Sequence, residues 1–172
     1  MQKTYLRHCI PSERDKKRKF PLPKHFDLRS GEDGLSFSDE SNCSIMQHMI
    51  WTGLSHNHKG AYIDAVSFRL FRYSEDILHD VGGHIKSTPV KHDSIPAPIG
   101  KPNNPAHCDV VISPEDQTAA RFKLSNYSQE NESTPDKEEM TDLIMRFREK
   151  GNDTPFHRVD KWGVIWFRGL GQ

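Results

Sequence analysis

The sequence predicts an α+β fold, a single compact domain over residues 1–172. We expect a mixed or antiparallel sheet with about three helices and long polar loops. The chain of 172 residues has the length of one ordinary domain. Its hydrophobic share of 34% is lean, but 24 basic residues balance 24 acidic ones, which favours a folded domain over a disordered chain. Strand-like and helix-like segments follow one another without the regular alternation of parallel βαβ units.

Strand patterns dominate the first half of the chain. Residues 3–10 are rich in strand formers and end at Pro11. The glycine and acidic residues of 31–34 predict a turn, and a short strand follows over 35–37. Residues 64–72 alternate between the two faces of a further strand.

Two helices are predicted between and after these strands. Apolar residues recur at three-to-four spacing over 44–55, and Ser41 or Asn42 is suited to cap the start. A short helical turn over 74–81 then closes at the glycine pair 82–83, as a helix C-terminus often does.

The second half begins with a long proline-rich loop over 87–105. Residues 106–113 give the most convincing buried strand, and Ser113 followed by Pro114 predicts the start of a helix.

Three segments complete the chain. Residues 127–135 are polar and predict a loop. An apolar stripe predicts a helix over 134–151, and the aromatic run at 159–167 predicts a terminal strand.

Composition limits the cellular compartments and the classes of binding partner that we expect for this chain. Zero net charge argues against a strongly basic nucleic-acid binder, although it leaves room for a local patch. Cys9, Cys43 and Cys108 are too few and too scattered for a disulfide framework, so we expect reduced thiols. No apolar run approaches the ~18 residues of a membrane span, and the N-terminus lacks a signal-peptide core. We therefore expect a cytoplasmic protein with no membrane association.

One basic stretch is a candidate for contact with phosphates. Each lysine or arginine that neutralises a phosphate adds a salt-dependent increment of binding. The alternative is an ordinary solvated loop. The candidate nucleic-acid or phosphate-binding residues are Arg14, Lys16, Lys17, Arg18, Lys19 and Lys24.

A second candidate is a small polar site of an enzyme. His107 lies where the proline-rich loop enters a buried strand, a junction where functional residues often gather. Its imidazole titrates near neutrality and suits a general acid or base, while a purely structural role is an equal alternative. The candidate catalytic residues are Arg7, Asp33, Ser36, Asn104 and His107.

Motifs for other chemistry are missing from the sequence. There is no Cys-x-x-Cys, no His-Glu-x-x-His and no Gly-x-Ser-x-Gly. We therefore predict no metal site and no cofactor, and we interpret the ten histidines as dispersed surface residues.

Three segments carry a resemblance to known proteins. They are the run from Leu6 to Pro11, the run Gly31-Glu32-Asp33-Gly34-Leu35-Ser36-Phe37, and Asn104-Pro105-Ala106-His107. Over roughly residues 5–112 the chain is similar to a family of small prokaryotic proteins of uncharacterised activity. Arg7-His8 also resembles the opening strand of ADP-ribosyltransferase-type domains, but the later tyrosine and glutamate of that family cannot be placed in this sequence.

Three functional hypotheses follow. The first is an accessory or binding protein of a prokaryotic system, which contacts a nucleic acid or a phosphorylated partner through the basic stretch. The second is an enzyme that acts on a nucleotide-like substrate. The third is a protein-interaction module, in which the strand at 159–167 adds to a partner's sheet.

Overall fold

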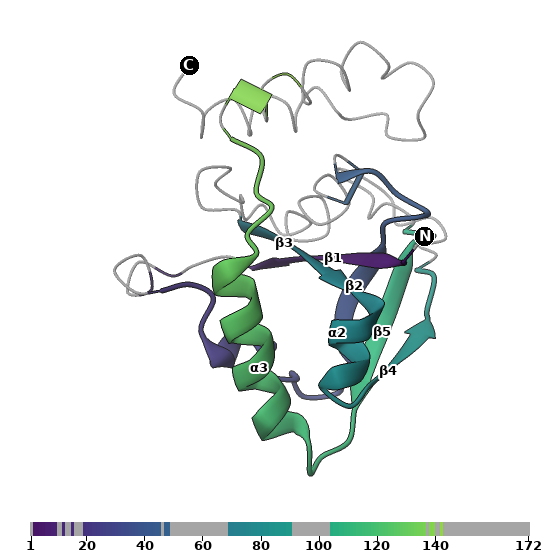
Figure 1. The fold of residues 1–172 in the computed structure, drawn as a ribbon. Helices are drawn as coiled ribbons and strands as arrows, with labels where there is room; N and C mark the ends of the chain where they lie inside the picture. Colours follow the sequence, from purple (N-terminus) through teal and green to yellow (C-terminus); the bar gives the residue numbers. More distant parts are fainter. Residues whose placement is uncertain are drawn as a thin grey trace.

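The computed structural model describes residues 2–9, 12, 15, 19–45, 47–48, 69–90, 104–136, 138–139 and 142. These residues form an α+β fold, as the sequence predicts (Figure 1). Five strands make one sheet in the order β3-β1-β2-β5-β4, and every neighbouring pair is antiparallel. The elements are β1 (Thr4–Cys9), η1 (Pro23–Phe26), β2 (Leu35–Asp39), β3 (Arg69–Ser74), α2 (Glu75–Asp80), β4 (Gly83–Ser87), β5 (His107–Ile112) and α3 (Gln117–Glu130).

Helices α2 and α3 pack on one face of the sheet, where the main core lies (Figure 1). The ring of Tyr73 meets that of Phe37 edge-on, with 5.3 Å between their centroids. Tyr73 also lies under α3, where its hydroxyl contacts Ser128 Oγ at 2.5 Å. Ser128 Oγ in turn donates to the carbonyl of Leu124 at 2.6 Å, so this buried hydroxyl pair is fully satisfied. The remaining core side chains come from β1, β2, β3, β5, η1 and both helices.

Residues on the opposite face of the sheet are buried as well. Leu6 and Leu70 have no exposed surface, although they alternate with core residues of the first face. Leu70 and its neighbour Phe71 are thus both buried, so β3 is covered on two sides. Arg72, on the same face as Leu70, pairs with Glu40 at 2.6 Å.

A segment after α3 covers the outer edge of β3. The backbone N–H of Leu70 donates to Thr134 Oγ1, and the N–H of Ser133 donates to the Leu70 carbonyl, both at 2.8 Å. Phe71 and Glu132 form an isolated antiparallel bridge beside them. The backbone groups that an edge strand normally exposes therefore find partners at this position.

Two glycines shape the connection from α2 to β4. Gly82 has a φ of +76°, the left-handed conformation that commonly ends a helix, which agrees with the predicted cap. Gly83 packs so closely that a Cβ there would lie 2.5 Å from the carbonyl oxygen of Leu78 and 2.6 Å from Val110 Cγ1. The helix can return directly onto the sheet only because Gly83 has no side chain.

Several element boundaries agree with the sequence and others correct it. The strands predicted at 3–10, 35–37 and 106–113 are present as β1, β2 and β5, and the helix predicted at 74–81 is present as α2. The predicted strand at 64–72 is described from Arg69 and extends to Ser74.

Two other expectations need correction, and one strand was missed. The helix expected from Ser113 begins at Gln117, because residues 113–116 form a turn in which the N–H groups of Asp116 and Gln117 both reach the Ser113 carbonyl. The loop expected over 127–135 is wrong at its start, since α3 continues to Glu130. Strand β4 was not predicted.

The helix expected at 44–55 is described only at its start. Ser44 and Gln47 form a reciprocal capping pair: Ser44 Oγ accepts from the Gln47 N–H, and the Gln47 side chain accepts from the Ser44 N–H. The cap is therefore Ser44, and not Ser41 or Asn42. Most of the predicted helix at 134–151 and all of the strand at 159–167 lie outside the described residues.

The three cysteines are free and buried. Burial raises the pKa of Cys43 and of Cys108 to about 12, so both remain protonated thiols at neutral pH. Among the helices that the described residues form, none has the length and apolar character needed to cross a bilayer.

Candidate functional site

The described residues enclose a pocket of about 380 Å³ beside the end of β1 and the start of β2. This volume lies within the range of small-molecule sites. The side chains around it bring three cations and two acids together. The lining residues are Arg7, His8, Cys9, Lys24, His25, Asp27, Leu28, Arg29, Glu32, Leu35 and Ser36.

Arg7 is the most constrained cation of the pocket. Strands β1 and β2 pair only at Tyr5–Asp39 and Leu6–Ser38, and the Arg7 side chain bridges the chains beyond that point. Its Nη1 donates to the Ser36 carbonyl at 2.7 Å, and its Nη2 donates to the His25 carbonyl at 3.0 Å. These two bonds fix the plane of the guanidinium.

Two buried aromatic rings hold the same guanidinium from the side. Its central carbon lies 5.5 Å from the ring centroid of Phe26 and 5.3 Å from that of Phe37, within the range of cation–π attraction. The Arg7 Nε is buried and has no hydrogen-bond partner among the described residues. Arg7 is thus pre-positioned before any ligand binds.

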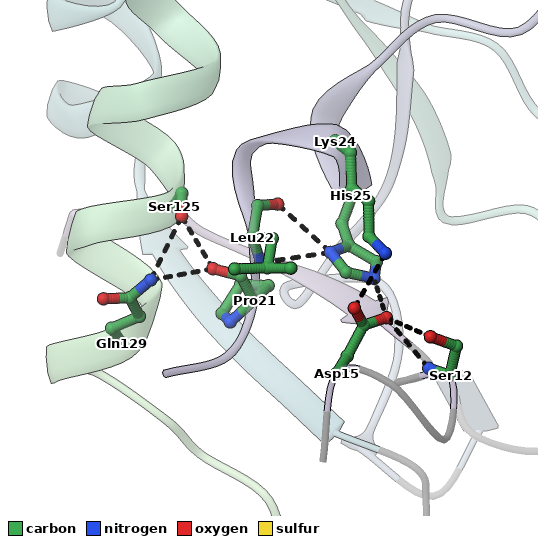
Figure 2. Close-up of polar contacts among 8 residues, drawn as sticks. All are labelled: Ser12, Asp15, Pro21, Leu22, Lys24, His25, Ser125 and Gln129. Atoms are coloured by element: carbon green, nitrogen blue, oxygen red, sulfur yellow. Dashed lines mark hydrogen bonds and ion pairs between the residues drawn. The ribbon is translucent and has the colours of Figure 1, made fainter. Parts of the chain in front are cut away.

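Lys24 reaches the pocket from η1 and is held by the carboxylate of Asp15 (Figure 2). Lys24 Nζ donates to Asp15 Oδ1 at 2.7 Å, and the second oxygen accepts from the N–H and Oγ of Ser12 at 3.0 and 2.7 Å. These bonds from Lys24 and Ser12 hold the pKa of Asp15 well below its ordinary value. The carboxylate therefore stays ionised and keeps the ammonium in place.

His25 completes the same network but adds no charge at neutral pH. Its Nδ1 accepts from the Leu22 N–H at 3.1 Å, and its Nε2 lies 3.6 Å from Asp15 Oδ2 (Figure 2). Burial lowers the pKa of His25 below its ordinary 6.5. The imidazole is consequently neutral at pH 7, and it positions the loop.

Helix α3 anchors the loop that carries Lys24 (Figure 2). The Pro21 carbonyl accepts from Ser125 Oγ at 2.6 Å and from Gln129 Nε2 at 2.9 Å. Arg121, one turn earlier on the helix, pairs with Asp27. The pocket is therefore built from β1, β2 and a loop that depends on α3 for its position.

The residues of the predicted basic stretch fall into three groups. Lys24 lines the pocket, and Lys19 is exposed outside it. The other four, Arg14, Lys16, Lys17 and Arg18, lie outside the described residues.

The five residues of the predicted polar site are not gathered in one place. Arg7 and Ser36 meet at the pocket through the Ser36 carbonyl. Asp33 is exposed in the turn before β2 and does not line the pocket. Neither Asn104 nor His107 lines it either.

Asn104 and His107 belong to contacts on the opposite face of the sheet. Asn104 Nδ2 lies 3.5 Å from Ser38 Oγ. His107 Nδ1 lies 2.9 Å from both the carbonyl oxygen and Oγ1 of Thr88. The His107 ring thus ties its strand to the segment after β4, which is the structural role named as an alternative above.

A buried pair that the sequence did not reveal, Ser38 and His48, lies beside Asn104. His48 Nδ1 is 2.9 Å from Ser38 Oγ, and the two residues are 4% and 2% exposed. Burial lowers the pKa of His48 to about 3, so the ring is neutral. Its Nε2 has no hydrogen-bond partner within the described part of the chain. With Ser38 this deeply buried, the pair is closed to a substrate.

Metal chemistry finds no support in the described ranges. No group of three or more His, Cys, Asp or Glu side chains there could hold a metal ion.

Comparisons with protein-family models, with curated proteins and with solved structures found no match. The similarity to a prokaryotic family and the likeness to ADP-ribosyltransferases therefore stay predictions.

Proposed function

We propose that this chain is a binding protein whose pocket at Arg7, Lys24 and Arg29 takes a phosphate-bearing ligand. The observation that carries the proposal is the Arg7 guanidinium, which two backbone carbonyls hold at the pocket. Each terminal nitrogen of a guanidinium has two N–H groups, and one of each is used by a carbonyl. The guanidinium also interacts with the Cys9 side chain, and the N–H groups that these contacts do not use are available to a ligand.

The physical chemistry of the pocket favours phosphate over an uncharged group. A guanidinium matches the geometry of phosphate oxygens, and a fixed one loses little conformational entropy on binding. Lys24 and Arg29 add two further cations from the adjoining loop. This proposal narrows the first hypothesis above to a defined site, and it uses Lys24 from the basic stretch.

Binding explains the described geometry better than the enzyme hypothesis does. The enzyme hypothesis needs His107 and Asn104 at the same site as Arg7, and neither lines the pocket. Two other histidines, His8 and His25, line the pocket, and His25 already uses Nδ1 in a hydrogen bond with the Leu22 backbone. The cations of the described lining favour recognition of an anion.

The test is a thermal-shift and calorimetric titration of the full chain with inorganic phosphate and adenosine monophosphate. A ligand at about one hundred times its Kd stabilises by ~2.7 kcal/mol, which raises Tm by ~2–4 °C per kcal/mol for a chain of this size. Arg29→Gln is expected to weaken binding about tenfold, the effect of one charged hydrogen bond of ~1.4 kcal/mol.

Lys3→Gln is the matched control, because Lys3 is exposed and precedes β1 at the end away from the pocket. This variant should bind as the native chain does. The proposal fails if neither phosphate compound binds, or if Arg29→Gln and Lys3→Gln bind equally well.

A further inference from the structure

We infer that the ligand of this pocket is a small phosphomonoester that carries hydroxyl groups, such as a sugar phosphate or a nucleoside monophosphate, and is not a nucleic-acid chain. The inference rests on the proposed function and specifies its ligand. Three features of the lining carry it: its charge pattern, its lack of a stacking surface and its fixed carboxylates.

The charges of the pocket lining suit a ligand with one phosphate group and not a nucleic-acid backbone with many. Arg7, Lys24 and Arg29 line the same pocket as Asp27 and Glu32, so the described part of the lining carries three positive and two negative side chains, a net charge of +1. A nucleic-acid backbone brings one negative charge per nucleotide and is bound by grooves lined with cations. The two carboxylates would repel each further phosphate of such a chain.

Among the described residues that line the pocket there is no Phe, Tyr or Trp on which bases could stack, and the rings there are the imidazoles of His8 and His25. The two aromatic rings closest to Arg7, Phe26 and Phe37, are 2% and 1% exposed because they pack in the core beneath the guanidinium. Proteins that bind single strands without sequence preference depend on exposed aromatic platforms, and the described lining offers no Phe, Tyr or Trp for this.

The carboxylates of Asp27 and Glu32 are fixed by contacts within the protein, so they are positioned before a ligand binds. Glu32 Oε2 accepts from the backbone N–H of Arg29 at 2.9 Å, and Asp27 pairs with Arg121. Carboxylate oxygens accept more than one hydrogen bond, and the hydroxyl groups of a sugar are suitable donors. A pocket lined by both cations and carboxylate acceptors matches a molecule with a phosphate and neighbouring hydroxyls.

The experiment compares four probes by calorimetry on the full chain: ribose 5-phosphate, inorganic phosphate, ribose, and a single-stranded oligonucleotide without terminal phosphates. We expect ribose 5-phosphate to bind at least about tenfold more tightly than each of the other three, as one further good polar contact would provide. Its affinity should fall only weakly with salt, because one phosphate is neutralised.

Glu32→Ala separates the hydroxyl contact from the phosphate contact. This variant should weaken ribose 5-phosphate about tenfold and leave inorganic phosphate unchanged or bound more tightly, because a repelling carboxylate is gone. Asp33→Ala is the matched control, since Asp33 is the adjacent acid and does not line the pocket.

The outcomes separate this inference from the proposed function. Tighter binding of the oligonucleotide would overturn the inference and keep the phosphate site. An equal effect of Glu32→Ala on ribose 5-phosphate and inorganic phosphate would overturn it as well. If no phosphate compound binds, both the inference and the proposed function are wrong.

Discussion

Arg7 donates to the backbone carbonyl of Ser36 at 2.7 Å, just beyond the last paired residues of β1 and β2. The Arg7 side chain therefore links β1 and β2 beyond the residues at which their backbones pair. The same guanidinium reaches the His25 carbonyl at 3.0 Å, so it joins two strands and a loop. Arg7 is consequently a structural residue as well as the centre of the candidate site.

Arg7→Lys should lower the free energy of unfolding by about 1–2 kcal/mol, because an ammonium cannot reach both carbonyls with the geometry of the guanidinium fork. Urea denaturation measures this difference. Arg29→Lys, a change at an exposed arginine of the same pocket, should stay within about 0.5 kcal/mol of the native chain. Equal urea midpoints for Arg7→Lys and the native chain would contradict the bridging role.

Asp15→Asn should destabilise the chain at neutral pH and do so less in acid. The folded pKa of Asp15 lies below its ordinary value of 3.8, so the stability that this group contributes is present above pH 3.8 and is lost as the pH falls toward the folded pKa. Urea midpoints of the native and variant chains should thus differ most at pH 7 and converge below about pH 3.8.

The exposed acid Asp33 provides the control for this pH series, and Asp33→Asn should leave the urea midpoint unchanged at every pH. A gap between Asp15→Asn and the native chain that stays constant from pH 7 to pH 3 would show that the carboxylate is not stabilised by its contacts.

Gly83→Ala should cost about 3 kcal/mol of stability, the upper part of the usual range for overpacking. The new Cβ would lie 2.5 Å from a backbone oxygen, which cannot move away as a flexible side chain would. Gly31→Ala is the comparison: Gly31 has a φ of +85° and open space around it, so the cost should be about 1 kcal/mol of backbone strain alone. Thermal unfolding of both variants checks the order, and a larger loss at Gly31 would contradict the packing of α2 against β4.

The buried hydroxyl pair of Tyr73 and Ser128 should show energetic coupling. Ser128→Ala leaves the Tyr73 hydroxyl buried without its acceptor, at a cost of about 1–3 kcal/mol. Tyr73→Phe with Ser128→Ala should be more stable than the sum of the two single effects, since neither partner is then left unsatisfied. A double-mutant cycle by urea denaturation measures the coupling, and strict additivity would show that the two hydroxyls do not interact.

The sequence predicted those elements whose structure is determined by local patterns of side chains and not by contacts with distant residues. Strand β5 was recognised from its apolar run, and α2 from the glycine pair that follows it. Strand β4 was not predicted because Ile85 is its only large apolar residue. The strand forms because it pairs with β5 along its whole length. The polar C-terminal end of α3 was predicted as a loop because its helical structure depends on Tyr73. Tyr127 and Ser128 contact this residue, which is far away in the sequence.

The candidate site was predictable only in part for the same reason. Arg7 and Ser36 lie on predicted strands and were named as candidate catalytic residues, and Lys24 was named with the basic stretch. Arg29 gave no signal and Glu32 was interpreted only as part of a turn, because their place beside Arg7 depends on residues far apart in the sequence, such as Arg121, which pairs with Asp27. No local pattern of sequence encodes that contact.

The contacts of residues 132–134 with β3 make the two edges of the sheet unequal. At β3 the Leu70 N–H and carbonyl are both occupied, so a foreign strand would first have to displace Thr134 and Ser133. Among the described residues, β4 has a neighbouring strand only on its β5 side. Addition of a strand from a second molecule is therefore obstructed at β3. At the other edge, the described features that oppose such pairing are the shortness of β4 and its Lys86.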